Sequence, residues 1–293
     1  MTPFEAILYG VVQGFTEWLP ISSTAHLRIL PALLGKPDPG AGFTAVIQLG
    51  TMLAVLIFFW RDLGRSGKAW FRSLRGIDKD SDDAKLAWAV FYGSIPIMLI
   101  GYALRHQISS PQVRSLNVIG VTLIVMGVVM LFAERYNAKN QKPRAVTVKD
   151  GVLIGFWQAL SLIPGMSRSG STISGGLFAG LDRYTAARFS FLLSVPSILA
   201  AGIYELYAER EVLFDTNLAG TAIATVVSFG VGYASIALLL QIIQRQGIAI
   251  FVAYRILLGV ALLAAVAAGK LPAVEPDAPT TARLPHVSPI ERA

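Results

Sequence analysis

The chain has 293 residues, of which 54% are hydrophobic and 15% are charged, with a formal net charge of +7. A soluble domain carries about 25% charged residues, so this composition excludes an ordinary soluble protein and indicates an integral membrane protein with several spans. The chain contains no cysteine, which excludes disulfides, thiol nucleophiles and cysteine-ligated metals.

The first hydrophobic region, 4–34, is interrupted near its middle by "LPISSTAH". Its start, "MTPFEAILYG", lacks the basic segment of a cleaved signal peptide, so we expect the region to stay in the protein. Gln13 and Glu17 are four residues apart and share one helix face. A carboxylate in a membrane normally marks a site or a pathway, and oxygen ligands suit Mg²⁺ or Ca²⁺. Glu17 and Gln13 are therefore candidate metal ligands, with helix packing as the alternative for Gln13.

The interruption also supplies Ser22, Ser23 and Thr24, at the place where a second helix would begin. One of them can cap that helix, but three exceed what a cap needs. His26 follows two residues later. A lone histidine is more often a packing residue, yet its closeness to Glu17 and the hydroxyls favours a catalytic role.

Six further stretches fit membrane spans, which need roughly 20 mainly apolar residues. They are residues 43–60, 86–104, 116–133, 189–204, 218–240 and 248–269. Only the last carries a charge well inside, at Arg255. We expect Arg255 either to bind phosphate or to extend its side chain to the cytoplasmic surface.

The second interrupted region, 151–181, contains "IPGMSRSGST". Its glycines, Gly165 and Gly170, let the backbone approach a ligand closely. Its hydroxyl side chains are Ser167, Ser169, Ser171 and Thr172. Arg168 offers a planar fork of donors that pairs with phosphate oxygens, and the helix that follows would add its N-terminal amides. The alternative for Arg168 is a salt bridge to Glu17.

We interpret both interrupted regions as re-entrant hairpins, because irregular backbone at membrane depth needs cover from protein or a water-filled cavity. Two kinked full spans are the alternative. The connections 61–85 and 135–149 hold seven and five Lys and Arg residues, whereas 105–114 and 205–215 hold two and one. Basic loops stay cytoplasmic, so both termini are expected outside.

The two interruptions resemble each other. "GVVQGFTEWLPISS" and "GFWQALSLIPGMSR" share a Gly three residues before a Gln, then a Pro, then hydroxyl residues. Three spans separate the copies, so the second would enter from the opposite face. That arrangement is typical of an inverted-topology repeat whose broken helices form a site near the bilayer midplane. Chance similarity between two apolar segments is the alternative.

Together these groups fit one kind of ligand. Arg168, the loop amides and the hydroxyls would hold phosphate, and Glu17 with Gln13 would hold a cation that neutralises it. Phosphoryl transfer needs little beyond such positioning and neutralisation. A site inside the membrane suggests a substrate with a lipid tail.

The two motifs resemble the signatures of the bacterial undecaprenyl-diphosphate phosphatases, also called bacitracin-resistance proteins. "QGFTEWLPISSTAH" matches Glu/Gln-x-x-x-Glu followed by Pro-x-Ser-Ser-Thr-x-His, and "PGMSRSGST" matches Pro-Gly-x-Ser-Arg-Ser-Gly. The resemblance runs to about residue 269. It implies hydrolysis of undecaprenyl diphosphate to undecaprenyl phosphate and inorganic phosphate, which recycles the carrier for peptidoglycan synthesis.

The resemblance also implies a divalent cation, a bacterial inner-membrane location, bacitracin resistance and an active site open to the periplasm. It gives catalytic roles to Glu17, Ser23, His26 and Arg168, and diphosphate binding to Ser22, Thr24, Ser167, Arg168, Ser169 and Thr172. Gln13 stands where many members have Glu, which leaves open whether it touches metal. The attacking group also stays open: His26, Ser23 with His26 as base, or a water activated by His26 or Glu17.

We therefore expect an all-α membrane protein with six transmembrane helices and two re-entrant hairpins in an inverted repeat. Residues 1–269 would form one domain, with halves at about 1–133 and 150–269, and 270–293 a disordered tail. The expected partners are the bilayer and a polyprenyl diphosphate, without nucleic acid; a monomer and a homodimer both stay open. A transporter or flippase of a phosphorylated lipid is the main alternative function, and a structural scaffold is a third.

Overall fold

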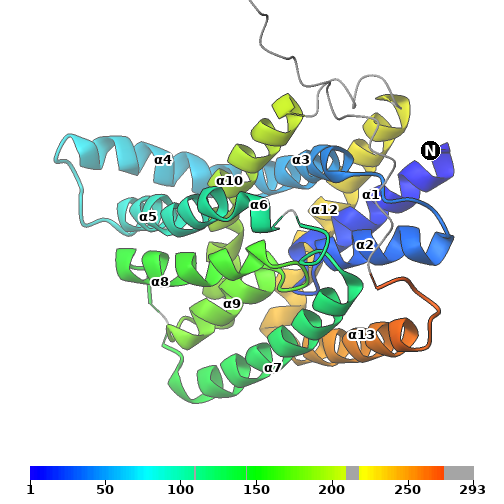
Figure 1. The fold of residues 1–293 in the computed structure, drawn as a ribbon. Helices are drawn as coiled ribbons and strands as arrows, with labels where there is room; N and C mark the ends of the chain where they lie inside the picture. Colours follow the sequence, from blue (N-terminus) through cyan, green and yellow to red (C-terminus); the bar gives the residue numbers. More distant parts are fainter. Residues whose placement is uncertain (109, 143, 209–217, 274–293) are drawn as a thin grey trace, which may run out of the picture.

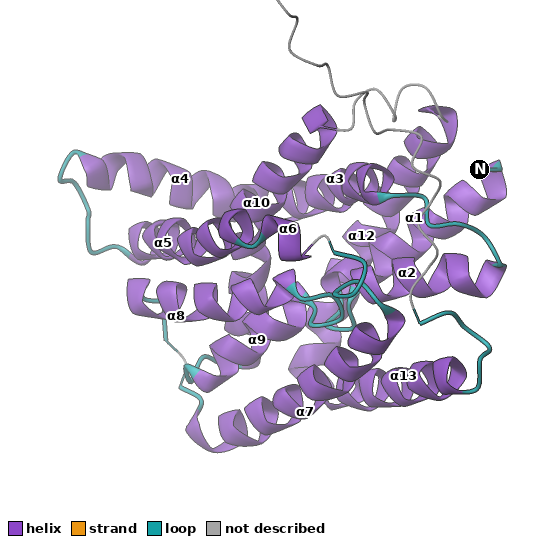
Figure 2. Ribbon diagram, in the orientation of Figure 1, coloured by secondary structure: helices purple, strands orange, loops and turns teal. Residues whose placement is uncertain are grey.

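The computed structural model describes residues 1–108, 110–142, 144–208 and 218–273, and all regular structure in those ranges is helical (Figures 1 and 2). The helices are α1 (Pro3–Trp18), α2 (Ser23–Leu34), α3 (Ala41–Phe58), α4 (Trp60–Leu74), α5 (Asp82–Ala103), α6 (Arg105–Ile108), α7 (Leu116–Asn140), α8 (Val148–Ala159), η1 (Leu160–Leu162), α9 (Arg168–Phe178), α10 (Arg183–Ala208), α12 (Leu218–Gln246) and α13 (Ala249–Ala267). The expected all-α class is confirmed.

Five of the described helices are long and apolar enough to cross a membrane: α5, α7, α10, α12 and α13. Helices α3 and α4 qualify as a sixth span only as a pair, which is bent by 75° at its break. These elements coincide with the six predicted spans, and the multi-span membrane class is confirmed.

The span boundaries differ from the prediction where polar residues cap the helices. Helix α5 begins at Asp82 rather than residue 86, because the side chain of Ser81 accepts a hydrogen bond from the Ala84 amide. Helix α10 begins at Arg183 rather than residue 189, and Asp182 accepts from the Thr185 amide at 3.0 Å. A prediction from apolar runs alone leaves out the polar first turns of these helices.

The connection 61–85 contains a helix that hydropathy did not reveal. The first predicted span was to end at residue 60, but α3 ends at Phe58 and α4 starts at Trp60. Helix α4 alternates basic and apolar side chains at helical spacing, so its mean hydropathy is low even though it is regular.

The first interrupted region is a helix, a short break and a second helix. Thr2 and Glu5 form a capping box that starts α1. The helix stops at Trp18, because Leu19 precedes Pro20 and is extended. Ser22 then takes a left-handed φ of 76° and caps α2 by accepting from the Ala25 amide.

The second interrupted region repeats this construction. Thr147 and Asp150 form the capping box of α8. One turn of 3₁₀ helix leads to extended Ile163, which precedes Pro164. Ser167 takes a left-handed φ of 67° and caps α9 by accepting from the Gly170 amide.

The first arm of each pair packs closely on a long helix. A Cβ built at Gly10 would lie 2.6 Å from the Ala224 carbonyl oxygen of α12. A Cβ at Gly151 would lie 2.4 Å from the Ala89 carbonyl oxygen of α5. Small residues at these positions allow backbones to approach in a membrane, where apolar burial gives little drive for association.

The first four residues of the predicted tail have a described structure. Within residues 270–273, Leu271 packs against a cluster of buried apolar residues that includes Leu116 and Leu262. The Leu116 amide donates to the Ala273 carbonyl at 2.9 Å. The remainder of the predicted tail, 274–293, lies outside the described residues.

Candidate active site

The two breaks meet at a small polar cavity of about 90 Å³. It is lined by Gln13, Glu17, Ser22, Ser23, Thr24, Leu27, Thr44, Gln48, Ser161, Gly165, Ser167 and Arg168. A larger cavity of about 620 Å³ lies at the α3–α4 corner and contains none of the predicted site residues. The smaller cavity is the candidate for chemistry, because hydroxyls, a carboxylate and a guanidinium converge there.

Glu17 is the centre of the hydrogen-bond network. Its side chain accepts from Ser23 Oγ at 2.7 Å, from Gln13 Nε2 at 3.1 Å and from Gln48 Nε2 at 3.0 Å. The residue is 7% exposed. A buried carboxylate is costly unless it is hydrogen-bonded, and these three donors meet that need while aiming it at the cavity.

Ser23 holds its hydroxyl directly against this carboxylate. The residue opens α2, where the cap at Ser22 fixes the first turn. Because Ser23 Oγ donates to Glu17, its proton already points at a base, and its lone pairs are free toward the cavity. This is the geometry of a nucleophile beside its general base.

Arg168 faces the same carboxylate from the other break. It opens α9, and its Nη1 lies 3.7 Å from Glu17 Oε1, an ion pair without a hydrogen bond. Its Nε and Nη1 are buried and have no hydrogen-bond partner among the described residues. Unpaired buried donors are costly, so these are positioned for an oxyanion that enters the cavity.

Both breaks store backbone strain at equivalent places. Apart from Asp78, Ser22 and Ser167 are the only non-glycine residues with positive φ in the described ranges. Such conformations cost about 1–3 kcal/mol and tend to occur at functional sites. At each break the strained residue lets the backbone turn directly into a helix, α2 or α9. The first side chain of that helix, Ser23 or Arg168, faces the cavity.

His26 lies beside the cavity but is engaged elsewhere. Its Nδ1 is 2.7 Å from the Ser22 carbonyl oxygen, and its Nε2 is 2.7 Å from the Tyr254 hydroxyl. Since a carbonyl can only accept, Nδ1 carries the proton, and in the neutral ring Nε2 accepts from the tyrosine. The two rings are nearly parallel, with centroids 5.7 Å apart.

Two of the predicted phosphate ligands do not line the cavity. Ser169 Oγ donates to the Leu19 carbonyl at 3.0 Å and ties the two breaks together. Thr172 Oγ1 bonds to the Arg168 carbonyl at 2.8 Å and to Ser190 of α10. The other predicted phosphate ligands, Ser22, Thr24, Ser167 and Arg168, do line it.

Arg255 does not reach the cytoplasmic surface, which corrects one of the two expectations for it. It is fully buried at 0% exposure, so it does not reach a membrane surface. Its Nη1 donates to the Pro20 carbonyl at 3.1 Å, and its Nη2 donates to the Gly165 carbonyl at 2.7 Å. Its guanidinium thus joins the backbones of the two breaks.

Sequence reasoning missed Gln48 and Tyr254. Gln48 is an amide within the apolar run of α3, and the rule that polar groups in spans mark sites would have selected it. Tyr254 precedes Arg255, but a tyrosine in a membrane helix gives no comparable signal.

The chain is similar to known proteins over nearly its whole length. A family model described as "Bacitracin resistance protein BacA" matches residues 6–261. A protein of Chlorobium limicola named undecaprenyl-diphosphatase is 47% identical over 284 residues, which cover 93% of this chain and 100% of that protein. Proteins of the same name from Nocardioides sp. and Chlorobaculum tepidum are 47% and 44% identical, over 92% of this chain and 98% and 99% of their own.

Proposed function

The chain belongs to the family of the bacitracin resistance protein BacA, and on that premise we propose that it is an undecaprenyl-diphosphate phosphatase. Its substrate would be undecaprenyl diphosphate and its products undecaprenyl phosphate and inorganic phosphate. The names of relatives at 44–47% identity support this activity. Return of the lipid carrier to peptidoglycan synthesis and resistance to bacitracin would follow from it.

The arrangement of Ser23, Glu17 and Arg168 is the observation that carries the proposal. A hydroxyl lies 2.7 Å from a carboxylate on one break, and a guanidinium with two buried unpaired donors lies across from it on the other. Phosphoryl transfer requires positioning and charge stabilisation above all. A binding site without chemistry has no need to aim a hydroxyl proton at a buried carboxylate.

In the proposed reaction Ser23 Oγ attacks the terminal phosphorus and passes its proton to Glu17. The bond from that phosphorus to the bridging oxygen breaks, and undecaprenyl phosphate leaves. Arg168 binds the oxygens of the transferred group, on which negative charge is spread. Glu17 gives its proton to solvent and then takes a proton from a water that attacks the phosphorus of the phosphoserine. The bond from phosphorus to Ser23 Oγ breaks, Glu17 returns that proton to Ser23 Oγ, and inorganic phosphate is released.

His26 has a supporting role in this scheme. Both of its ring nitrogens are used, one on the Ser22 carbonyl and one on Tyr254, and neither lies against Ser23. It would hold the first turn of α2, and with it Ser23, in place. Ser169 would act similarly by tying the two breaks together.

The residues present can hold a divalent cation in part. In the described ranges no three His, Cys, Asp or Glu side chains come together. However, the Oε1 atom of Gln13 is buried without a partner beside Glu17, and Mg²⁺ is commonly held by one or two protein oxygens together with substrate phosphates. Glu17 and Gln13 would therefore hold it with the diphosphate. The cation would neutralise phosphate charge.

Several features support two re-entrant hairpins related as an inverted repeat. The arms α1, α2, α8 and α9 have 16, 12, 12 and 11 residues, short of the roughly 20 that a span needs. Their breaks face each other, while their open ends point to opposite sides of the molecule (Figure 1). Capping Ser22 follows Gln13 by nine residues, and capping Ser167 follows Gln158 by nine.

The basic connections support the orientation. With 61–85 and 135–149 on the cytoplasmic side, the first hairpin opens outward and both termini lie outside. The cavity would then receive its substrate from the outer side of the bacterial inner membrane.

The test is phosphate release from undecaprenyl diphosphate by the purified protein, with and without EDTA. We expect metal-dependent release, a loss of at least about 10³-fold in Ser23→Ala and Glu17→Gln, and a smaller loss in His26→Ala. Acid-quenched reactions should contain a phosphoserine at residue 23. Activity retained in Ser23→Ala but lost in His26→Ala would transfer the nucleophile to the histidine.

The flippase alternative makes a different prediction. Folded wild-type protein that releases no phosphate, yet moves a phosphorylated polyprenol across vesicles faster than empty vesicles do, would reject the enzyme assignment. The repeat architecture alone is compatible with transport; the hydrogen bond from Ser23 to Glu17 is the feature that favours the enzyme.

A further inference from the structure

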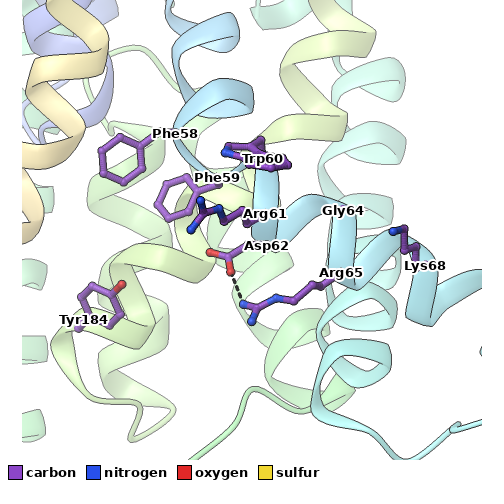
Figure 3. A pocket seen from close by; sticks show the side chains of 9 residues that line it. All are labelled: Phe58, Phe59, Trp60, Arg61, Asp62, Gly64, Arg65, Lys68 and Tyr184. Atoms are coloured by element: carbon purple, nitrogen blue, oxygen red, sulfur yellow. Dashed lines mark hydrogen bonds and ion pairs between the residues drawn. The ribbon is translucent and has the colours of Figure 1, made fainter.

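The larger cavity lies at the corner between α3 and α4 (Figure 3). It shares no lining residue with the candidate active site. Phe59 at the break is buried at 4% exposure and packs on Phe191 of α10, which fixes the corner. Helix α4 leaves α3 at an angle of 75°. If α3 crosses the membrane, a helix at that angle to it would run close to the membrane plane. Helix α4 forms the first part of the basic connection 61–85, so the corner lies on the side of the membrane that this connection occupies.

Helix α4 has three sides. On the inward side Leu63 packs against the main core, and Trp70 packs on Trp88 of α5, whose Nε1 donates to Ser73 Oγ at 2.9 Å. A second side is apolar and points outward, where Trp60 and Phe71 are each 63% exposed. An apolar stripe presented away from the protein at a membrane face is typical of a helix that lies in the lipid interface.

The third side of α4 is cationic. Arg61, Arg65, Lys68 and Arg72 recur every three or four residues and are exposed. The first three line the cavity, and in Figure 3 they follow one another along the helix. Arg61 also lies 5.3 Å from the ring centroid of Trp60, so charge and aromatic surface adjoin.

The acidic group in the cavity does not cancel this charge. Asp62 accepts from Arg188 Nε at 3.1 Å and from Arg65 Nη2 at 2.6 Å, so its carboxylate is satisfied within the protein. Among the described residues, no carboxylate forms an ion pair with Arg61 or Lys68. The cavity therefore offers at least two uncompensated cations beside an aromatic wall.

We propose that this corner binds an anionic phospholipid of the adjacent leaflet. Figure 3 shows Tyr184 and Lys68 at opposite ends of the cavity with Arg61 between them. Arg61 would therefore contact the phosphate, Lys68 would add positive charge beside the headgroup, and the acyl chains would cover Trp60 and Phe71. Basic residues beside a membrane surface attract anionic headgroups, and interfacial tryptophan sits at headgroup depth. The site takes a phosphodiester lipid, whereas the candidate active site takes a terminal phosphate.

The test compares retention of phosphatidylglycerol and phosphatidylcholine by the purified protein, using native mass spectrometry of mixed micelles. Wild-type protein should retain phosphatidylglycerol preferentially. The double variant Arg61→Gln/Lys68→Gln should bind phosphatidylglycerol about tenfold or more weakly than wild type. The variant Arg61→Lys should bind it within about threefold of wild type. Millimolar inorganic phosphate should leave lipid binding unchanged.

The matched control removes the same charge from the same face at the end of α7. Arg135 and Lys139 are exposed and lie outside the cavity, so Arg135→Gln/Lys139→Gln should bind like wild type. An equal loss in both double variants, or in neither, would overturn the proposal, and displacement by inorganic phosphate would identify an ion site instead. If the double variant fails to fold, the single variants Arg61→Gln and Lys68→Gln should each show a partial loss.

Discussion

Among single residues, Arg168 is the one whose proposed role depends most on the exact type of side chain. Its Nε and Nη1 are both buried and have no hydrogen-bond partner among the described residues, so two donors of one planar group are available for ligand oxygens. Lysine keeps the charge but offers a single compact ammonium. We expect Arg168→Lys to lose nearly as much phosphatase activity as Arg168→Ala, about 10²–10³-fold.

The measurement is steady-state phosphate release, with circular dichroism to establish folding. The control is Arg105→Lys on exposed α6, which should retain wild-type turnover. Near-normal turnover in Arg168→Lys would mean that charge alone suffices, and the bidentate role would have to be abandoned.

Arg255 is a positioning residue whose loss should affect stability first. Its guanidinium joins the Pro20 carbonyl of one break to the Gly165 carbonyl of the other. In Arg255→Met these buried acceptors would lose their donors, at a cost of about 1–3 kcal/mol for each unsatisfied group. We expect a lower melting temperature in detergent together with reduced activity. Wild-type melting with lost activity would instead indicate contact with substrate.

For single residues, the sequence predicted which side chains belong to the site better than it predicted which groups they contact. Glu17, Ser23 and Arg168 were candidates because polar groups in apolar segments are rare and costly, and the structure brings them together. Arg255 stood out for the same reason, but its partners are backbone carbonyls, which have no sequence signal. Gln48 and Tyr254 come from other helices, α3 and α13, and only tertiary packing brings them near.

Among the elements, the close contacts of α1 with α12 and of α8 with α5 offer a direct test. A methyl group at Gly151 would enter the space of the Ala89 carbonyl, which is backbone and cannot turn aside. We therefore expect Gly151→Ala to force α8 away from α5 and to lower the melting temperature by several degrees, with loss of activity because Arg168 follows on the same hairpin.

A matched glycine is available for comparison. Gly230 lies inside α12, and the position that a methyl group would take there has nothing within 4 Å. Gly230→Ala should therefore be neutral or slightly stabilising, since alanine favours helix by about 1 kcal/mol. Equal destabilisation by both substitutions would mean that helix packing at Gly151 is unimportant.

The elements were predictable where hydropathy or helix breakers dominate. The apolar runs gave the spans, and Pro20 and Pro164 marked the two breaks. Helix α4 was missed because its basic and apolar sides average out along the sequence. The early starts of α5 and α10 were missed because they depend on the caps at Ser81 and Asp182.

Across the whole molecule, the two broken helix pairs are built alike at their breaks and carry different side chains. Ser22 and Ser167 cap equivalent helices, and the next residue is Ser23 in one copy and Arg168 in the other. Four residues after the matching glutamines stand Glu17 and Leu162. On the proposed repeat, one copy supplies nucleophile and base while the other supplies the phosphate clamp, so neither half is a complete site.

The opposed entry of the two hairpins can be tested directly, because the chain contains no cysteine. Single cysteines at exposed Pro37, Lys142 and Gln246 report the loops after α2, after α7 and after α12. In the re-entrant arrangement residues 142 and 246 share one side and residue 37 lies on the other. Of the described helices between 142 and 246, α10 and α12 alone then cross the membrane.

We expect a membrane-impermeant maleimide to label Pro37→Cys in intact cells, and to label Lys142→Cys and Gln246→Cys only after permeabilisation. Each variant must first retain phosphate release, so that labelling reports the native arrangement. If α8 and α9 formed a kinked full span, a third crossing would put residue 246 on the side opposite 142. Labelling of Gln246→Cys but not Lys142→Cys in intact cells would therefore exclude the second hairpin, and with it the inverted repeat.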